Sequence, residues 1–183
     1  MTFNIGLIIN PLAGLGGSVA LKGSDDVASE ALALGAVPKA NARCLQALAE
    51  VADLDVCVYA FAGDMGANCA LSAGLKTEVV GKAKTQPSSA ADTISAAQML
   101  LTRGVDLLVF VGGDGTARDL LSAIGDQVPV VGIPAGVKIH SGVYGITPMA
   151  AGQVIAQLIK GELVSLRSQE VRDIDEQEFR AGR

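Results

Sequence analysis

The sequence is poor in the residues that build metal centres, disulfide frameworks and nucleic-acid surfaces. Its 183 residues include three cysteines, one histidine, no tryptophan and only 3% aromatic residues. The cysteines are far apart and form no CxxC pair, so we expect neither a zinc site nor a disulfide framework. They are predicted to be small buried hydrophobes in a reducing cytoplasm. The net charge is −5 with scattered lysine and arginine, which disfavours nucleic-acid binding.

Long apolar runs and a secretory leader are also missing. No stretch approaches the roughly 18 uninterrupted apolar residues of a membrane span. The opening MTFNIGLIIN has neither a basic region nor a cleavage site. We therefore predict a cytoplasmic protein with no membrane partner. Hydrophobic residues nevertheless make up 50% of the chain, and its length supports one ordinary domain with a filled core.

Short apolar runs rich in β-branched residues alternate with alanine-rich stretches that have helical spacing. Several runs are continuously apolar, which is typical of strands covered by helices on both faces. The alternation predicts an α/β fold with an open, mainly parallel sheet, right-handed crossovers and helices on both faces. The expected strands are residues 3–9, 54–61, 77–82, 105–111 and 128–133.

Two of the helices predicted between these strands are alanine-rich. One of them begins at a cap near Ser89, carries Asp92 in its first turn and ends at Gly104. An earlier helix covers residues 41–52. The residues expected on its apolar face are Cys44, Leu45, Leu48 and Val51.

Another helix and a change of composition define the predicted domain boundary. Thr147 is expected to cap this helix, Pro148 to occupy its first position, and Gly161 to end it. Residues 162–183 then begin like a strand and become densely charged. We interpret residues 1–161 as a nucleotide-binding α/β domain. The remainder is interpreted as the start of, or linker to, a second β-rich domain, with a solvated tail as the alternative.

The stretch LLVFVGGDGT, residues 107–116, is the strongest functional signal. Gly112, Gly113 and Gly115 could direct backbone N–H groups into one concavity suited to phosphate oxygens. A helix predicted from residue 117 would add its favourable N-terminus, and Thr116 could cap it or donate to phosphate. Asp114 becomes useful if it orients an attacking hydroxyl or holds Mg²⁺ beside the phosphate. The alternative is a plain turn in which Asp114 only caps the helix.

Two further polar segments are expected at the carboxyl ends of strands, where ligands bind in parallel sheets. They are NPLAGLGGS, residues 10–18, and PAGVKIHSG, residues 134–142. The dinucleotide fingerprint, the P-loop and the nucleophile elbow fit none of the glycine segments. The additional candidates for nucleotide binding are Asn10, Gly14, Gly16, Gly17, Lys138 and Ser141.

These segments together resemble the ATP–NAD kinase family. The motif VGGDGTARDL is similar to a signature shared with diacylglycerol and sphingosine kinases and with phosphofructokinases. The longer pattern adds LIINPLAGLGG and IPAGVKIHSGVYGITPMAAG, and it resembles the bacterial and archaeal ATP–NAD kinase-like branch. Lipid kinases have a later loop closer to GTGNDFAR, from which PAGVKIHSG departs. The resemblance covers nearly the whole chain as the N-terminal domain of that family.

The resemblance implies a Rossmann-like domain, an activity and its site. Such enzymes transfer the terminal phosphoryl of ATP with Mg²⁺, or of polyphosphate, to the 2′-hydroxyl of NAD, giving NADP. By resemblance Asp114 accepts the hydroxyl proton, while Gly112, Gly113, Gly115 and Thr116 hold phosphates. A second domain grips the adenosine of NAD, so this chain alone is expected to be incomplete, and homo-oligomers are usual. A lipid or small-metabolite kinase and a nucleotide-sensing domain without turnover remain as alternatives.

Overall fold

All five predicted strands form, and they lie in one parallel sheet with the order β3-β2-β1-β4-β5. The computed structural model of the chain describes residues 2–13, 39–85, 88–134 and 147–162. The mainly parallel α/β sheet predicted from the apolar runs is thereby confirmed. The strands are β1 Phe3–Ile9, β2 Val56–Phe61, β3 Lys76–Gly81, β4 Leu107–Gly112 and β5 Val130–Pro134.

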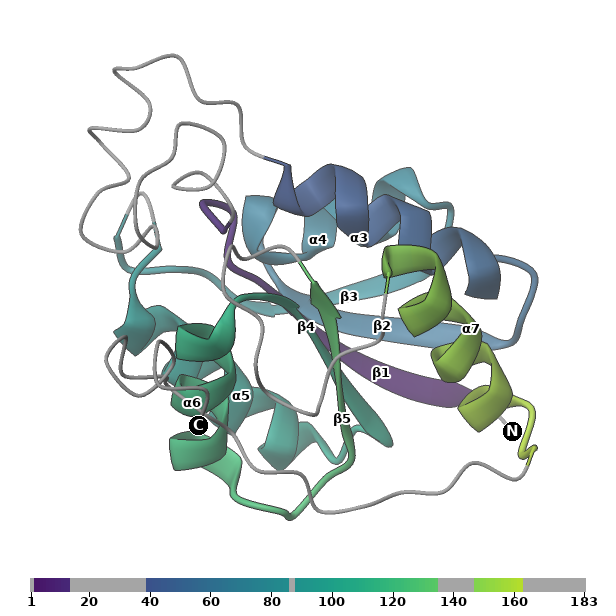
Figure 1. Cartoon of the computed structure of the whole chain (residues 1–183). Coiled ribbons are helices and arrows are strands. Elements are labelled where there is room, and N and C mark those ends of the chain that lie inside the picture. Colours follow the sequence, from purple (N-terminus) through teal and green to yellow (C-terminus); the bar gives the residue numbers. More distant parts are fainter. Residues whose placement is uncertain (1, 14–38, 86–87, 135–146, 163–183) are drawn as a thin grey trace, which may run out of the picture.

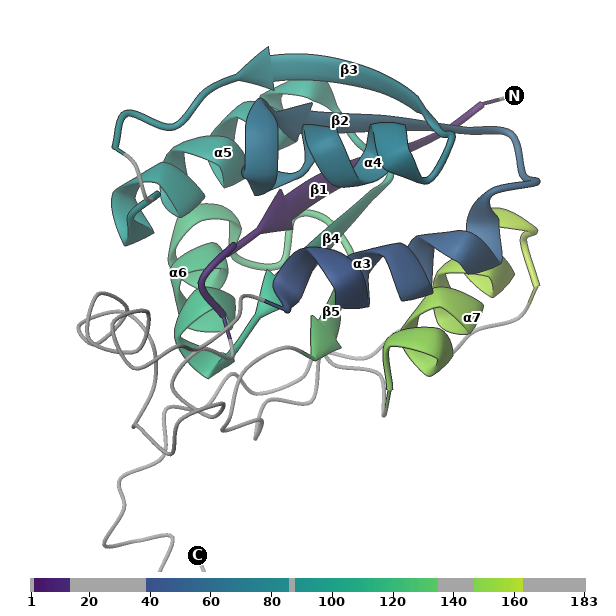
Figure 2. The ribbon, with the colours of Figure 1, turned by 90° about the horizontal axis from the view of Figure 1, so that it is seen from above.

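Helices cover both faces of this sheet, as predicted (Figures 1 and 2). One face carries α3 Ala40–Leu48, α4 Ala67–Ser72 and α7 Pro148–Ile159. The other carries α5 Ala90–Arg103 and α6 Asp114–Ile124, which pack against each other. Two short 3₁₀ turns complete the described elements, η1 Ala49–Val51 and η2 Gly63–Met65. Across the described ranges, no helix has the length and apolarity needed to cross a membrane.

The core consists of two apolar clusters, one on each side of the sheet. Ile5, Leu7 and Ile9 of β1 pack with α3, α4 and α7, whereas Ile8 packs with α5 and α6. This division follows from the alternation of side chains along a strand. All six residues of β4 are buried, which explains why its sequence is continuously apolar.

The helix predicted over residues 41–52 is present as α3 followed by η1. Cys44, Leu48 and Val51 are fully buried, but Leu45 is 36% exposed, so its place on the predicted apolar face is wrong. Ala47 is buried instead. Each residue advances the helix by about 100°, and Leu45 lies at the margin of the stripe while Ala47 faces the core.

The caps predicted for α5 and α7 are confirmed. The Ser89 hydroxyl accepts from the backbone N–H of Asp92, and α5 ends at Gly104, whose φ of 73° is left-handed. The Thr147 hydroxyl accepts from Ala150 N–H at 3.0 Å. These signals are local in sequence, which is why they could be read without the fold.

Asp92 also fixes the loop between β3 and α5. Its carboxylate accepts from the backbone N–H of Lys84 at 2.8 Å, the Thr85 hydroxyl at 2.9 Å and the Ser89 backbone N–H at 2.9 Å. The Asp92 residue is only 3% exposed. The hydrogen bond from the Lys84 N–H has the largest effect. Together these donors lower the pKa of Asp92 to about 2, although burial opposes the shift. The folded structure therefore favours the charged form of Asp92.

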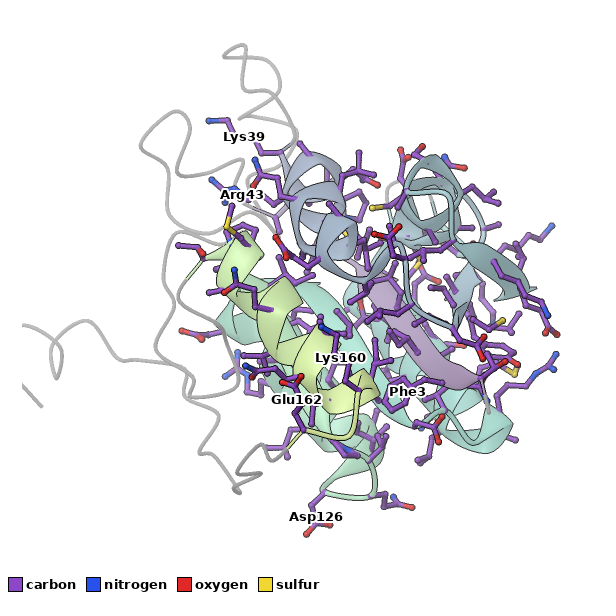
Figure 3. The ribbon with its side chains drawn as sticks, turned by 90° about the vertical axis from the view of Figure 1, so that its right-hand side faces the viewer. Phe3, Lys39, Arg43, Asp126, Lys160 and Glu162 are labelled. Carbon is purple, nitrogen blue, oxygen red and sulfur yellow. The ribbon has the colours of Figure 1, made fainter. Side chains whose placement is uncertain are left out.

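Helix α7 packs closely on α3 through Gly152. A Cβ atom at Gly152 would lie 2.9 Å from the carbonyl carbon of Ala47, so only glycine fits this approach. Figure 3 shows the end of α7, with Lys160 and Glu162, on the side of the molecule where β1 begins at Phe3. The helix thus returns the chain to the amino edge of the sheet. The strand expected after Gly161 lies outside the described residues.

Candidate functional site

Asn10 and the segment from Gly112 to Thr116 lie where the strand order of the sheet reverses, between β1 and β4. Ile9 of β1 is level with Val111 of β4, and the next residue, Asn10, donates its backbone N–H to the Val111 carbonyl at 2.9 Å. Gly112 is in turn level with Pro134 of β5. All three strands therefore end at the same edge (Figure 1). In open parallel sheets this reversal point is where ligands bind.

Asn10 shapes the loop that follows β1. Its side-chain oxygen accepts from Leu12 N–H at 3.2 Å, and its carbonyl oxygen accepts from Ala13 N–H at 3.0 Å. The chain therefore turns sharply at the carboxyl edge, as Asx turns do. The amide nitrogen of Asn10 is a donor and is the side-chain group that can bind a phosphate oxygen, whereas the amide oxygen accepts within the turn.

Gly112 makes room for Thr116, one turn further along the chain. A Cβ atom at Gly112 would lie 2.7 Å from Thr116 Cβ and closer still to its hydroxyl. Thr116 is 6% exposed, so its side chain packs inside the strand-to-helix turn. Thr116 is therefore a packing residue of the turn, and the predicted cap at Thr116 is wrong because the cap position belongs to Gly113.

The helix after β4 begins three residues earlier than predicted. Helix α6 starts at Asp114, and the predicted start at residue 117 is wrong. Asp114, which the predicted start leaves outside the helix, occupies the first position of α6 and is 6% exposed. The two glycines beside Asp114 made the segment look like a loop, but Gly115 lies within the first helical turn. Tertiary packing has overridden its weak helix propensity.

The predicted concavity of backbone N–H groups is not built from left-handed glycines. Gly113 has φ −103° and ψ −165°, an extended conformation, and none of Gly112, Gly113 and Gly115 has a positive φ. The anion-attracting feature is instead the N-terminus of α6. The first turn of a helix presents N–H groups without acceptors inside the helix, and Gly113 has no side chain to cap them.

Two side chains of opposite charge lie in the first turns of α6. Asp114 lies at the positive end of the helix dipole, which favours its carboxylate. Arg118 is exposed and lies four residues later, hence on the same side of the helix. Sequence reasoning did not select Arg118, although its spacing from Asp114 in GGDGTAR could have identified it once the helix start was known. A carboxylate and a guanidinium thus stand one turn apart at this edge.

Some predicted site residues cannot be placed. Those outside the described residues are Gly14, Gly16, Gly17, Lys138 and Ser141. For the residues that the structure describes, no group of three or more His, Cys, Asp or Glu side chains could hold a metal ion. Cys44, Cys57 and Cys69 are buried, as predicted.

Comparison with known proteins agrees with this architecture. The family described as ATP-NAD kinase N-terminal domain matches residues 5–163, which is most of the chain. The protein therefore belongs to the ATP–NAD kinase family and contains its N-terminal domain. No curated protein matches the chain significantly. Family membership confirms the predicted resemblance and the Rossmann-like fold, and it indicates a phosphotransferase of the ATP–NAD kinase type.

Proposed function

We propose that this protein transfers the terminal phosphoryl of ATP, or of polyphosphate, to the 2′-hydroxyl of NAD and so forms NADP. The observation that supports this most is the position of Asp114. A buried carboxylate begins helix α6 beside the point where the strand order reverses. An acid at that place is suited to a hydroxyl that must attack a phosphate held at the helix N-terminus.

The donor nucleotide would bind with its phosphates at the start of α6. Phosphate oxygens are attracted by the first-turn N–H groups and by the helix dipole. The Asn10 amide nitrogen approaches from the neighbouring loop, because Asn10 and Val111 are joined by a backbone hydrogen bond. In this proposal Gly14, Gly16, Gly17, Lys138 and Ser141 provide the remaining contacts.

Mg²⁺ would enter with ATP and neutralise charge between its phosphates. Magnesium commonly keeps several water ligands and is bound by one or two carboxylates together with substrate phosphates. The described residues fit that mode without a dedicated metal cluster, because the phosphates and water would supply most of the ligands beside the anion-binding end of α6. The ion would offset the repulsion between the Asp114 carboxylate and the phosphates of the nucleotide.

Asp114 would orient the acceptor hydroxyl and receive its proton. A carboxylate is too weak a base to ionise a ribose hydroxyl in advance, but phosphoryl transfer has a loose transition state in which the proton leaves late. Holding the hydroxyl oxygen in line with the phosphorus then contributes much of the rate. Asp114 is well placed for this because the buried first turn of α6 fixes its backbone.

Residues 1–161 form the nucleotide-binding domain in this proposal, and residues 162–183 begin, or link to, a second β-rich domain. The matched family describes an N-terminal domain and extends to residue 163. The adenosine of NAD would lie between the two domains. The protein is proposed to be a cytoplasmic homo-oligomer with small-molecule nucleotides as its partners.

A product assay tests the reaction. The protein, together with any residues that its coding sequence adds beyond Arg183, is incubated with Mg²⁺ and either ATP or polyphosphate. Parallel reactions contain NAD or diacylglycerol as acceptor. We expect NADP and no phosphatidic acid. Phosphatidic acid formation would favour a lipid kinase, and nucleotide binding without any product would favour a sensing domain.

A further inference from the structure

Two of the three cysteines meet at the contact between α3 and α4. The Cys69 thiol of α4 lies 3.7 Å from the carbonyl oxygen of Asn41, to which it donates a hydrogen bond. Asn41 and Cys44 are three residues apart on α3 and therefore share one side of that helix. Both thiols belong to the same buried cluster, and each shifts the pKa of the other, which places them beside one another where α4 meets α3.

The pair is buried and electronically unequal. Cys44 is 0% and Cys69 2% exposed, in the same apolar cluster. The hydrogen bond to Cys69, followed by burial, raises the pKa of the Cys44 thiol. The hydrogen bond from Cys44 lowers the pKa of Cys69, against the opposing effect of burial. Cys69 is therefore the thiol that becomes a thiolate first, and thiolates are the reactive form.

Helix α4 is the element through which a reagent could reach this pair. It has six residues and lies between Gly66 and Gly74, both of which have positive φ. Helices this short are not stable by themselves, so α4 depends on its packing. Its outer side exposes Leu71, which is 59% exposed. Short elements with few buried contacts open locally at a lower free-energy cost than core strands.

We propose that Cys44 and Cys69 are a thiol pair that a small disulfide oxidant converts into a disulfide joining α3 to α4. The Cys69 thiolate attacks one sulfur of the oxidant, whose S–S bond breaks and releases one thiolate. The Cys44 thiolate then attacks the Cys69 sulfur and displaces the second half of the oxidant. Two electrons pass from the protein to the oxidant, and the two thiol protons end on the released thiols.

The disulfide would constrain a defined part of the fold. It closes the chain between Cys44 and Cys69, a segment that contains all of β2. Cross-linking a loop of this size restricts the unfolded state, and we expect Tm to rise by about 5–10 °C on oxidation. This modification is independent of the proposed phosphoryl transfer, because Cys44 and Cys69 lie in the core below α3 and α4.

The test is oxidation of the folded protein with glutathione disulfide, followed by alkylation of the remaining thiols in denaturant and mass spectrometry. We expect Cys57 to be the one alkylated cysteine. Cys44 and Cys69 should appear in a cross-linked peptide whose mass is two hydrogens lower than that of the two reduced peptides together. Cys57 is a matched control because it is buried like the other two cysteines. It lies on β2, however, and points to the face of the sheet opposite to that of Val56 and Val58. The Cys57→Ala variant should therefore form the same cross-link and gain the same Tm shift.

The single variants of the pair separate the two steps. In Cys44→Ala, Cys69 should stop at a mixed disulfide with glutathione, and no internal cross-link should form. In Cys69→Ala, Cys44 should stay largely unmodified. The wild-type measurement does not depend on whether these variants fold. Three free thiols in the folded wild-type protein, at an oxidant level that oxidises a reference dithiol, would overturn the proposal, as would a cross-link that involves Cys57.

Discussion

Asp114 occupies the first turn of α6 and is 6% exposed, so a substitution there changes a buried group at a helix end. Asp114→Asn keeps the shape and should cost at most about 1 kcal/mol through the lost interaction with the helix dipole. We expect ATP affinity within a few-fold of wild type. Phosphoryl transfer to NAD should fall on the order of a hundredfold or more, because no group remains to accept the proton.

The matched control is Asp126→Asn, in the exposed turn after the far end of the same helix (Figure 3). It changes the net charge equally but leaves the carboxyl edge of the sheet untouched, so its turnover should equal that of wild type. Steady-state rates of NADP formation for both variants decide the matter. Near-normal turnover by a folded Asp114→Asn protein would remove this residue from the mechanism.

Gly113 allows nucleotide binding to be separated from folding. Its φ of −103° and ψ of −165° are extended, and a β-branched residue adopts them readily. Gly113→Val should therefore fold normally, while its side chain crowds the approach to the first turn of α6. We expect calorimetry to show ATP·Mg²⁺ affinity reduced at least about tenfold, as for a loss of 1.4 kcal/mol. The control is Gln127→Val, because Gln127 is exposed and lies beyond the other end of α6. Equal ATP·Mg²⁺ affinity in both variants would mean that the α6 N-terminus does not bind phosphate.

Asp92 makes stability depend on pH in a defined window. Its folded pKa of about 2 is below the ordinary value of 3.8, so the unfolded chain binds the proton more tightly. The stabilisation is therefore fully present above about pH 4 and is lost as the pH falls toward 2. Its size is on the order of 2 kcal/mol.

Urea unfolding of wild type and Asp92→Asn measures this contribution. At pH 7 the variant should be less stable by about 2 kcal/mol, since the buried carboxylate with its several donors is replaced by an amide. The difference should shrink as the pH approaches 2. A stability gap that stays constant across this range would show that charge on Asp92 contributes nothing.

Among the helices, the contact of α7 with α3 depends on a single missing side chain. Gly152→Ala would place a Cβ atom against the Ala47 backbone, which can move only with the whole of α3. We expect a loss of about 1–3 kcal/mol in the free energy of unfolding, despite the better helix propensity of alanine. Gln153→Ala, at the next and exposed position, should be neutral or slightly stabilising. If Gly152→Ala is also stabilising, the two helices do not pack as closely as described.

The elements that could be predicted from sequence are those with local signals. Ser89, Gly104 and Thr147 marked helix ends correctly because capping involves only neighbouring residues. Helix α4 was missed since six residues cannot display helical periodicity. The start of α6 was misplaced because Gly113 and Gly115 favour a loop locally, whereas burial of Asp114 and Thr116 favours the helix.

Across the molecule, the sheet could be predicted but its strand order could not. Continuous apolar runs indicated parallel strands, and parallel strands have their carboxyl ends at one edge. Which strands are neighbours depends on contacts between distant residues, such as Asn10 with Val111, and no local pattern encodes those. The adjacency of β1 and β4 is nevertheless what brings Asn10 next to the start of α6.

The central claim is that nucleotide phosphates bind at the carboxyl edge between β1 and β4. Titrating ATP·Mg²⁺ into the isotope-labelled protein, with backbone amide resonances assigned, tests it directly. The account predicts that the largest shifts fall on Asn10, Leu12 and the Gly113–Thr116 turn, while Asp55, Asp106 and Asp126 at the opposite edge stay unchanged. Shifts centred on that opposite edge, or none at saturating ATP·Mg²⁺, would contradict it.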